Sequence, residues 1–408
     1  MKLFLVLLAV VAVGVLWLAF RPKSAPARRR PPAPAAAPAP APKLVPATDA
    51  PLKFPQPDAR PIPAIAAILA AGAASELESA EMPELLADLR LLTLDDLTEA
   101  QRDELQGRLA GIPLPPRSTQ LLMSPDFLAE AATRQFTDLV TREPLLSGKV
   151  IGRVNSAFYG LSSPIVSVSH AVTYLGLNAV RNMALQFTLE QAFSSEDPEL
   201  QGFHARLFDA GTIAAELCSL LGPKMGVRDV GAASTQAVLS FLGDFAMPNL
   251  LPGGTAINNW PLGLLERTCN EQLSIGANAA IVGDLLMQEW GMPATVTDDV
   301  RDINRVLVTP ASENMQARDT RLALCYACAR IAEGIALGRI RDPGQIELVN
   351  SLEPEYYHLQ GYLKVPPLSR LQDMLHAPDA RLALSRLIAA SQRSRETPSA
   401  APPMRRRR

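Results

Sequence analysis

Hydrophobic and polar residues alternate with helical spacing along much of the chain, most clearly over residues 143–187. Apolar residues three and four positions apart fall on one face of a helix. Pro144 suits the first turn, where its missing N–H has no helical partner to lose. Gly160 and Gly176 suit helix ends, because glycine turns left-handed there without a Cβ clash. The pattern predicts three short helices, the first carrying Leu146, Val150, Val154, Ala157, Phe158 and Leu161 on one face.

Other parts of the chain show the same period. Over residues 64–111 we expect two or three short helices, the last capped by Thr98 and Gln101. Near the start of the third helix of the central segment, Asn178 is available as a cap. No alternating run is long enough to require a sheet, so the sequence predicts an all-α fold. Further helical patterns cover residues 203–251, 271–289, 316–337 and 368–393, with 271–289 read as one amphipathic helix.

Residues 3–20 contain no charged side chain. As a helix they would span about 27 Å, close to the hydrocarbon thickness of a bilayer. Basic residues are denser after this run than before it, at Arg21, Lys23 and Arg28–Arg30, so the positive-inside rule places the rest of the chain in the cytoplasm. We therefore expect a single-pass anchor. The alternative is a cleaved signal peptide, with Ala25–Ala27 as its cleavage site and a periplasmic mature chain.

Composition and charge divide the rest. Residues 21–63 hold fourteen prolines among alanines, which predicts an extended, disordered linker. The formal net charge of −2 gives no reason to expect a nucleic-acid partner. Between Glu76 and Leu105 the sequence contains ten acidic residues and only two arginines. We interpret this segment as the solvated face of small helices packed on the main domain; the alternative is a surface for a basic partner protein.

The central segment carries several short motifs in a fixed order. They are Glu143-Pro144-Leu145, Asn155 to Gly160 (NSAFYG), Pro164-Ile165, Ala171-Val172, Leu175-Gly176-Leu177 and Val180-Arg181-Asn182. In this order they resemble the HD-related output domain (HDOD) family of bacterial signalling proteins. The resemblance implies a compact, multi-helix, degenerate HD-like domain without catalysis of its own. It implies an output or scaffold role in signal transduction, through contacts with signalling proteins whose identity the sequence does not give.

With this resemblance the predicted organisation is complete. The chain would sit on a bacterial inner membrane with its soluble part cytoplasmic. In order, the predicted parts are a transmembrane anchor at 1–20, a Pro/Ala-rich linker at 21–63, an acidic short-helix segment at 64–111, an HDOD-like domain at 112–308, a C-terminal helical extension at 309–393 and a disordered basic tail at 394–408.

The related HD phosphohydrolases hold metal ions with several histidines and an aspartate, which together activate water. This chain has four histidines, none adjacent to an aspartate. It has Leu242-Gly243-Asp244 where an HD pair would fall, Ala279 where a helix would carry a histidine, and Ile303-Asn304 where a His-His pair would follow. We therefore expect no enzyme, catalytic residue, metal or cofactor, and interpret Asp244 as a surface or capping carboxylate. The alternative is a degenerate HD-type phosphohydrolase or nucleotide sensor.

The cysteines suggest no second chemistry. Cys325 and Cys328 form a CxxC on an alanine-rich helix, while Cys218 and Cys269 stand alone in the sequence, so no second pair completes a zinc site. We expect all four to behave as small buried apolar residues.

The NSAFYG turn provides the candidate contact site. Asn155 and Ser156 either tie a helix end to the next loop or belong to an exposed patch. In the second interpretation, Arg153, Phe158 and Tyr159 would offer an aromatic and basic surface to a protein or a nucleotide. Arg181 would join Arg153 at a phosphate if the fold brought them together. The candidate contact residues are thus Arg153, Asn155, Ser156, Phe158, Tyr159 and Arg181.

Overall fold

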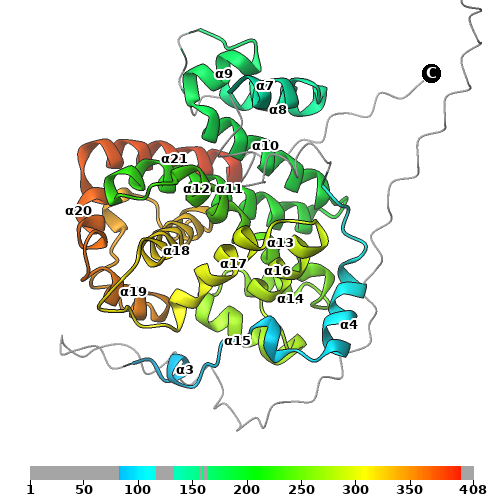
Figure 1. The fold of residues 1–408 in the computed structure, drawn as a ribbon, viewed down its shortest axis with the longest axis vertical. Coiled ribbons are helices and arrows are strands. Elements are labelled where there is room, and N and C mark those ends of the chain that lie inside the picture. Colours follow the sequence, from blue (N-terminus) through cyan, green and yellow to red (C-terminus); the bar gives the residue numbers. More distant parts are fainter. Residues whose placement is uncertain (1–81, 116–132, 156–158, 160, 162, 397–408) are drawn as a thin grey trace, which may run out of the picture. The chain divides into compact units, whose positions relative to one another are not determined.

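A computed structural model of the chain describes residues 82–115, 133–155, 159, 161 and 163–396, all in one compact unit (Figure 1). The predicted anchor, the linker and residues 397–408 lie outside the described residues. Within that described part the secondary structure is entirely helical, which confirms the predicted all-α class. None of its helices is long and apolar enough to cross a membrane.

The described part of the acidic segment, residues 82–111, packs on the main domain, as expected. It contains α3 (Glu84–Ala87), the 3-10 turn η1 (Leu94–Asp96) and α4 (Glu99–Leu109). The capping box predicted at the start of α4 is present, with Gln101 N–H donating to Thr98 Oγ1 at 3.3 Å. Apolar side chains of the segment enter the main hydrophobic core, namely Leu86, Leu97, Leu105 and Leu109.

Polar contacts also hold this segment, against the end of α15 (Leu264–Ile275) and the start of α16 (Ala279–Glu289). Leu92 N–H donates to Gln272 Oε1 at 2.9 Å, and Gln272 Nε2 donates to Arg90 O at 3.0 Å. Asn278 Nδ2 donates to Leu92 O at 3.0 Å. Two side-chain amides thereby hold an extended stretch of backbone, as a neighbouring strand would.

The central segment, residues 143–187, forms the three predicted helices, which share a small core with the preceding helix α7 (Thr133–Thr141). The helix after α7 begins at Pro144, as predicted, and ends at Val154, with Asn155 as C-cap. This end comes earlier than the predicted one at Gly160, a residue that lies outside the described residues. The next helix ends at Gly176, whose φ of 85° confirms the expected stop. Gly176, and not Asn178, then caps α10. The four helices are α7 (Thr133–Thr141), α8 (Pro144–Val154), α9 (Val168–Leu175) and α10 (Leu177–Ala192).

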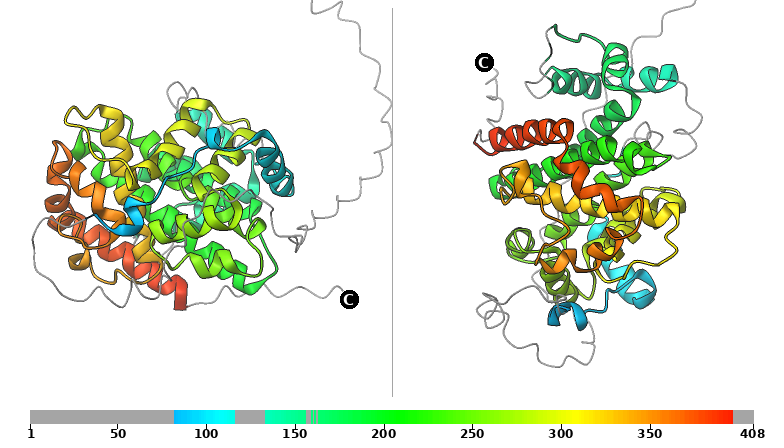
Figure 2. Two further views of the ribbon diagram at one scale, coloured as in Figure 1. Left: turned by 90° about the horizontal axis from the view of Figure 1, so that it is seen from below. Right: turned by 90° about the vertical axis from the view of Figure 1, so that its left-hand side faces the viewer.

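The main core lies around two long helices, α11 (Pro198–Leu221) and α18 (Ala317–Ala336), which pack against each other. α12 packs on both of them, and α13 packs on α16; these helices are labelled in Figure 1, and Figure 2 shows the molecule from two further sides. The remaining elements of this part are η2 (Pro223–Met225), α12 (Val230–Leu239), α13 (Leu242–Ala246), η3 (Met247–Asn249), α14 (Thr255–Asn259), α15 (Leu264–Ile275), α16 (Ala279–Glu289), α17 (Ala294–Ile303) and η4 (Asn304–Leu307).

The single helix predicted over residues 271–289 is wrong. The chain breaks at Gly276, where φ is 65°, and Asn278 starts a new helix by accepting Ile281 N–H at 3.1 Å. A left-handed glycine followed by an asparagine cap is a stop and a start signal. The two helix ends beside this break are the ones that hold the acidic segment.

The C-terminal extension completes the same core. Leu384, Leu387 and Ile388 of its last helix are buried there, and that helix packs on α11 and α18. The extension includes α18, and after it come η5 (Pro343–Gln345), η6 (Pro354–Tyr356), α19 (Tyr357–Tyr362), η7 (Leu368–Arg370), α20 (Leu371–His376) and α21 (Pro378–Glu396).

Candidate functional site

Asn155 connects the end of α8 to the segment before α9. Its Nδ2 donates to Ile151 O at 2.8 Å and to Ile165 O at 2.7 Å, and its Oδ1 accepts Ile165 N–H at 2.8 Å. These bonds use the amide in the way the structural interpretation of the turn expects. Two other candidates, Ser156 and Phe158, lie outside the described residues.

Tyr159 and Arg153 both face α11. The Tyr159 side chain hydrogen-bonds with Glu216, and burial together with the charge of Glu216 raises the pKa of the tyrosine. Asp209 lies on the same helix. Burial raises the pKa of its carboxyl to about 6, and the positive charge of Arg153 opposes that rise. Both candidates thus interact with carboxylates inside the domain.

Arg181 lies elsewhere, against α12. Its side chain is buried, and Nη2 donates to Thr235 Oγ1 at 2.8 Å. Arg153 acts on Asp209 and Glu216 of α11, so the two arginines have different partners among the described residues. The predicted joint phosphate site of Arg153 and Arg181 has no support in this geometry.

The aspartate at the HD position is buried, so its interpretation as a surface or capping carboxylate is wrong. Asp244 lies on α13 and is 5% exposed. Its neighbour Gly243 touches the start of α16 so closely that a Cβ there would overlap the carbonyl oxygen of Ala279. α13 and α16 therefore meet backbone to backbone at two of the positions where an HD enzyme would place ligands.

A buried arginine faces this aspartate. Arg267, on α15, places Nε 3.3 Å from Asp244 Oδ1. Its Nη1 and Nη2 donate to the two carboxylate oxygens of Glu333 on α18, at 3.0 and 3.2 Å. The guanidinium also lies over the Trp260 ring, 4.7 Å from its centroid. A two-pronged contact of this kind fixes both groups in orientation as well as in distance.

Two further ionisable groups complete the cluster. Arg330 also contacts Glu333, and Glu271 accepts Ala279 N–H at 2.9 Å. Burial raises the pKa of Glu271, and the charge of Asp244 raises it further. Burial works against the charged form of Glu333, but Arg267 and Arg330 overcome it and lower the pKa of that carboxyl. Charged Glu333 thus balances the arginines, while Glu271 tends to keep its proton.

These residues do not fit an HD-type metal centre. Such a centre needs several nitrogen and oxygen donors around an open position for water. Here Asp244 faces a guanidinium, and the other expected ligand positions are occupied by Gly243, Ala279, Ile303 and Asn304. Within residues 82–115, 133–155 and 163–396, histidine, cysteine and carboxylate side chains form no group of three or more that could hold a metal ion.

The cysteines are all buried as free thiols, as expected for small apolar side chains. Cys218, however, is not isolated: it lies beside Cys325 and Cys328 where α11 packs on α18. The contact with Cys218 and burial both raise the pKa of Cys325, which keeps it a thiol.

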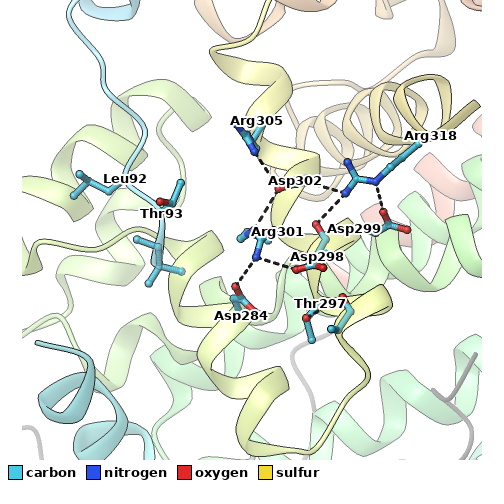
Figure 3. Close-up of polar contacts among 12 residues, drawn as sticks. Leu92, Thr93, Asp284, Thr297, Asp298, Asp299, Arg301, Asp302, Arg305 and Arg318 are labelled. Carbon is cyan, nitrogen blue, oxygen red and sulfur yellow. Dashed lines mark hydrogen bonds and ion pairs between the residues drawn. The ribbon is translucent and has the colours of Figure 1, made fainter. Parts of the chain in front are cut away.

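A second charged cluster joins α16, α17 and α18 near the surface (Figure 3). Arg318 bridges Asp299 and Asp302 at 2.7 Å each, and Arg301 reaches Asp298 at 3.0 Å and Asp284 at 3.4 Å. Arg305 and Arg321 add further contacts to Asp302 and Asp299, so four arginines balance the four aspartates and the cluster offers no excess charge to a ligand. It cross-links three helices.

Sequence reasoning missed Arg267, Glu271 and Glu333. The available signal was a charged residue inside an apolar helix, clearest at Glu333 in the run ARIAEGIA. Such residues are almost never buried unless paired, so each one predicts a partner. Which partner it finds depends on how the helices pack.

The comparisons with known proteins agree with the motifs. The HDOD domain model matches residues 112–306. No curated protein matches the chain. Similar solved structures include an HDOD domain protein of unknown function from Geobacter sulfurreducens, at 15% identity and a TM-score of 0.46, covering 72% of this chain and 98% of the other.

Two other solved structures show the same degree of similarity. One is a protein from Marinobacter aquaeolei provisionally named a signal transduction protein, at 19% identity and a TM-score of 0.47, covering 74% of this chain and 68% of the other. The second, from Shewanella amazonensis, is provisionally named a phosphohydrolase; it shows 17% identity and a TM-score of 0.47, covering 70% and 97% of the two chains. Residues 112–306 are thus an HDOD domain.

Proposed function

We propose that this protein is a non-catalytic output or scaffold module of signal transduction that acts through protein contacts. The observation that supports this most directly is the Arg267 guanidinium against Asp244. A fixed cation from the chain itself stands beside the one HD-like carboxylate, with Glu333 on its other side.

The closure of this position supports the same proposal. Asp244, Arg267, Glu271 and Glu333 are all buried, and Gly243 meets Ala279 without space for another side chain. A substrate phosphate would have to reach Asp244 through packed helices and compete with an ion pair already formed. The packing at this position therefore argues against hydrolysis there.

Exposed apolar side chains at and just before α9 support a role in protein contacts. Val166, just before α9, is 78% exposed, and Tyr174 on α9 is 57% exposed. Tyrosine is enriched where proteins bind each other, because its ring is apolar and its hydroxyl can still meet water. We propose that α9 contributes to the contact with a signalling partner.

We also propose a membrane location for the protein. The uncharged run at residues 3–20 and the basic residues after it favour a single-pass anchor, with the HDOD domain on the cytoplasmic side of a bacterial inner membrane. A fluorescent reporter fused after Arg408 should then fold and fluoresce in the cytoplasm. Activity of a fused alkaline phosphatase would instead support the periplasmic alternative.

The test of the contact role is chemical crosslinking of the full-length protein in intact membranes, followed by affinity capture. The test variant is Val166→Ser with Tyr174→Ala, and the matched control is Leu352→Ser, an 89% exposed leucine of the C-terminal extension. Circular dichroism and melting must first be the same for all three proteins. We expect a discrete partner with wild type and control that the test variant loses. Identical capture by all three would remove α9 from the proposal, and no capture by any would contradict the scaffold role.

A further inference from the structure

Arg181 differs from the other buried arginines. Among the described residues, the arginines with buried side chains are Arg181, Arg267 and Arg330. Arg267 contacts Asp244 and Glu333, and Arg330 contacts Glu333. Arg181, which is 2% exposed, has no ion pair with any described residue. Since buried charges are normally paired, its missing counter-charge calls for an explanation.

The hydrogen bonds around Arg181 leave donors over. Nη2 donates to Thr235 Oγ1, while the buried Nε has no partner. Thr235 Oγ1 in turn lies 3.1 Å from Asn182 Oδ1 and 3.0 Å from Gly231 O. The guanidinium thus sits among polar groups of α10 and α12, with at least one N–H free to bind an acceptor.

The carboxylate of Asp229 compensates the positive charge of Arg181 only in part. Burial lowers the pKa of Arg181 to about 10, so the side chain remains charged at neutral pH. Asp229 acts on it electrostatically, but Asp229 is exposed and its Oδ1 accepts Ala232 N–H at 2.8 Å, as the N-cap of α12. The carboxylate is used at the helix end and screened by water, so the chain leaves most of the buried charge uncompensated.

We propose that Arg181 binds a phosphate-type oxyanion between α10 and α12, with the Thr235 hydroxyl beside it. A guanidinium presents N–H groups in a planar fork that matches two oxygens of such an anion. The side of the site nearest the surface lies one helical turn away, where the exposed Asn178 side chain packs against Gly231. An anion reaching Arg181 would enter by displacing this amide.

The position of the site suggests how a bound anion would affect the domain. α10 supplies Val180, Met183 and Ala184 to the smaller core, and α12 supplies Ala233 and Val238 to the main core. α10 also supplies Leu185 and Leu189 to the main core, so an anion between α10 and α12 would stiffen the domain where the two cores meet. Binding would then be one way for the module to read a small-molecule signal.

The experiment is a titration of the full-length protein with inorganic phosphate at constant ionic strength, balanced with chloride and followed by calorimetry and by melting temperature. Wild type should give a saturable binding curve and a saturable rise in melting temperature. Arg181→Lys keeps the charge but loses the fork, and should bind at least about tenfold more weakly. Thr235→Val removes the hydroxyl with little change in shape and should also weaken binding. Arg228→Gln, an exposed arginine just before α12, is the control and should bind as wild type does.

Parallel titrations with pyrophosphate and a nucleoside monophosphate identify the source of the oxyanion. Tighter binding of the nucleotide than of phosphate would show that the anion is part of a larger ligand, and equal binding would favour the free ion. The proposal fails if none of the three gives a saturable response in wild type. It also fails if Arg181→Lys and Thr235→Val respond as wild type does. If Arg181→Lys does not fold, Thr235→Val against Arg228→Gln decides the question.

Discussion

Single residues at the HD position carry the argument about function. Asp244 is the one HD-like ligand that the sequence retains, and the sequence alone suggested a surface role for it. The structure buries it against Arg267, which also contacts Glu333. These partners lie far apart along the chain, on α13, α15 and α18, so no local pattern could have paired them. The pairing arises from helix packing.

Removing the Arg267 guanidinium should lower the free energy of unfolding. Arg267→Met would leave Asp244 and Glu333 buried without this partner, and losing one member of a buried ion pair typically costs about 3–5 kcal/mol. Arg339→Met is the control, because Arg339 contacts the same Glu333 at 3.4 Å from a partly exposed position, where an ion pair contributes about 0–1 kcal/mol. Urea unfolding of both variants measures the difference. Equal losses would contradict the central place of Arg267.

Glu271 should make the stability depend on pH. Burial raises its pKa from 4.5 to about 8, so the folded state holds a proton that the unfolded state releases. Its contribution to stability is therefore full below about pH 4.5 and is lost as the pH rises through about 8. Glu271→Gln keeps an oxygen for Ala279 N–H but has no proton to lose, so its melting temperature should fall less between pH 5 and 8 than that of wild type.

The exposed Glu289→Gln is the control for this pH dependence. Its melting curve should follow that of wild type across the range. If Glu271→Gln shows the same decline as both of these proteins, Glu271 is ionised in the folded state, and the assignment of its proton is wrong.

At the scale of helices, local signals were predictable and contacts between helices were not. Pro144 at a helix start, Gly176 at a helix end and the Thr98–Gln101 box act within one turn, and the structure confirms all three. The sequence also contains the signal for the break at Gly276, a glycine followed by an asparagine cap. Apolar residues keep helical spacing on both sides of it, so the pattern resembled one continuous helix. The close approach of Gly243 to Ala279 had no local signal, because its cause lies on another helix.

That approach gives a prediction for α13. In Gly243→Ala the new methyl group would overlap the backbone of Ala279, which can yield only if the helices separate. Overpacking of this kind typically costs about 1–3 kcal/mol, and more where backbone is the obstacle. Gly148→Ala is the matched control, since it lies in α8 with nothing near its Cβ and should stabilise by up to about 1 kcal/mol. Thermal unfolding should separate the two; a neutral Gly243→Ala would mean that α13 and α16 are not in contact.

For the whole molecule, the folded unit extends beyond the residues that identify the family. The family match starts at residue 112, but Leu86, Leu97, Leu105 and Leu109 fill the main core from before it, and α21 fills the core from after it. Composition suggested an acidic surface segment at 64–111, and its leucines were the sign that it would also be an integral part of the domain.

A chain that begins at residue 112 should therefore be much less stable than one that begins at residue 82. Each fully buried leucine contributes roughly 1.5–3 kcal/mol, and the shorter chain also loses the contacts of residues 90–92 with Gln272 and Asn278. Urea unfolding of both chains beside the full-length protein tests this. Equal midpoints for the two truncated chains would show that the acidic segment is not part of the fold.

The central claim is that the chain's own ion pair stands where HD enzymes bind metal. The most direct test is the divalent metal content of the full-length protein, purified without chelator and then dialysed against manganese, beside Asp244→Asn. We expect far less than one ion per chain in both, because Asp244 faces a guanidinium and, among the described residues, belongs to no group of three or more side chains that could hold a metal ion. One tightly bound ion per wild-type chain, absent from Asp244→Asn, would show that the position still holds a metal and would contradict the account.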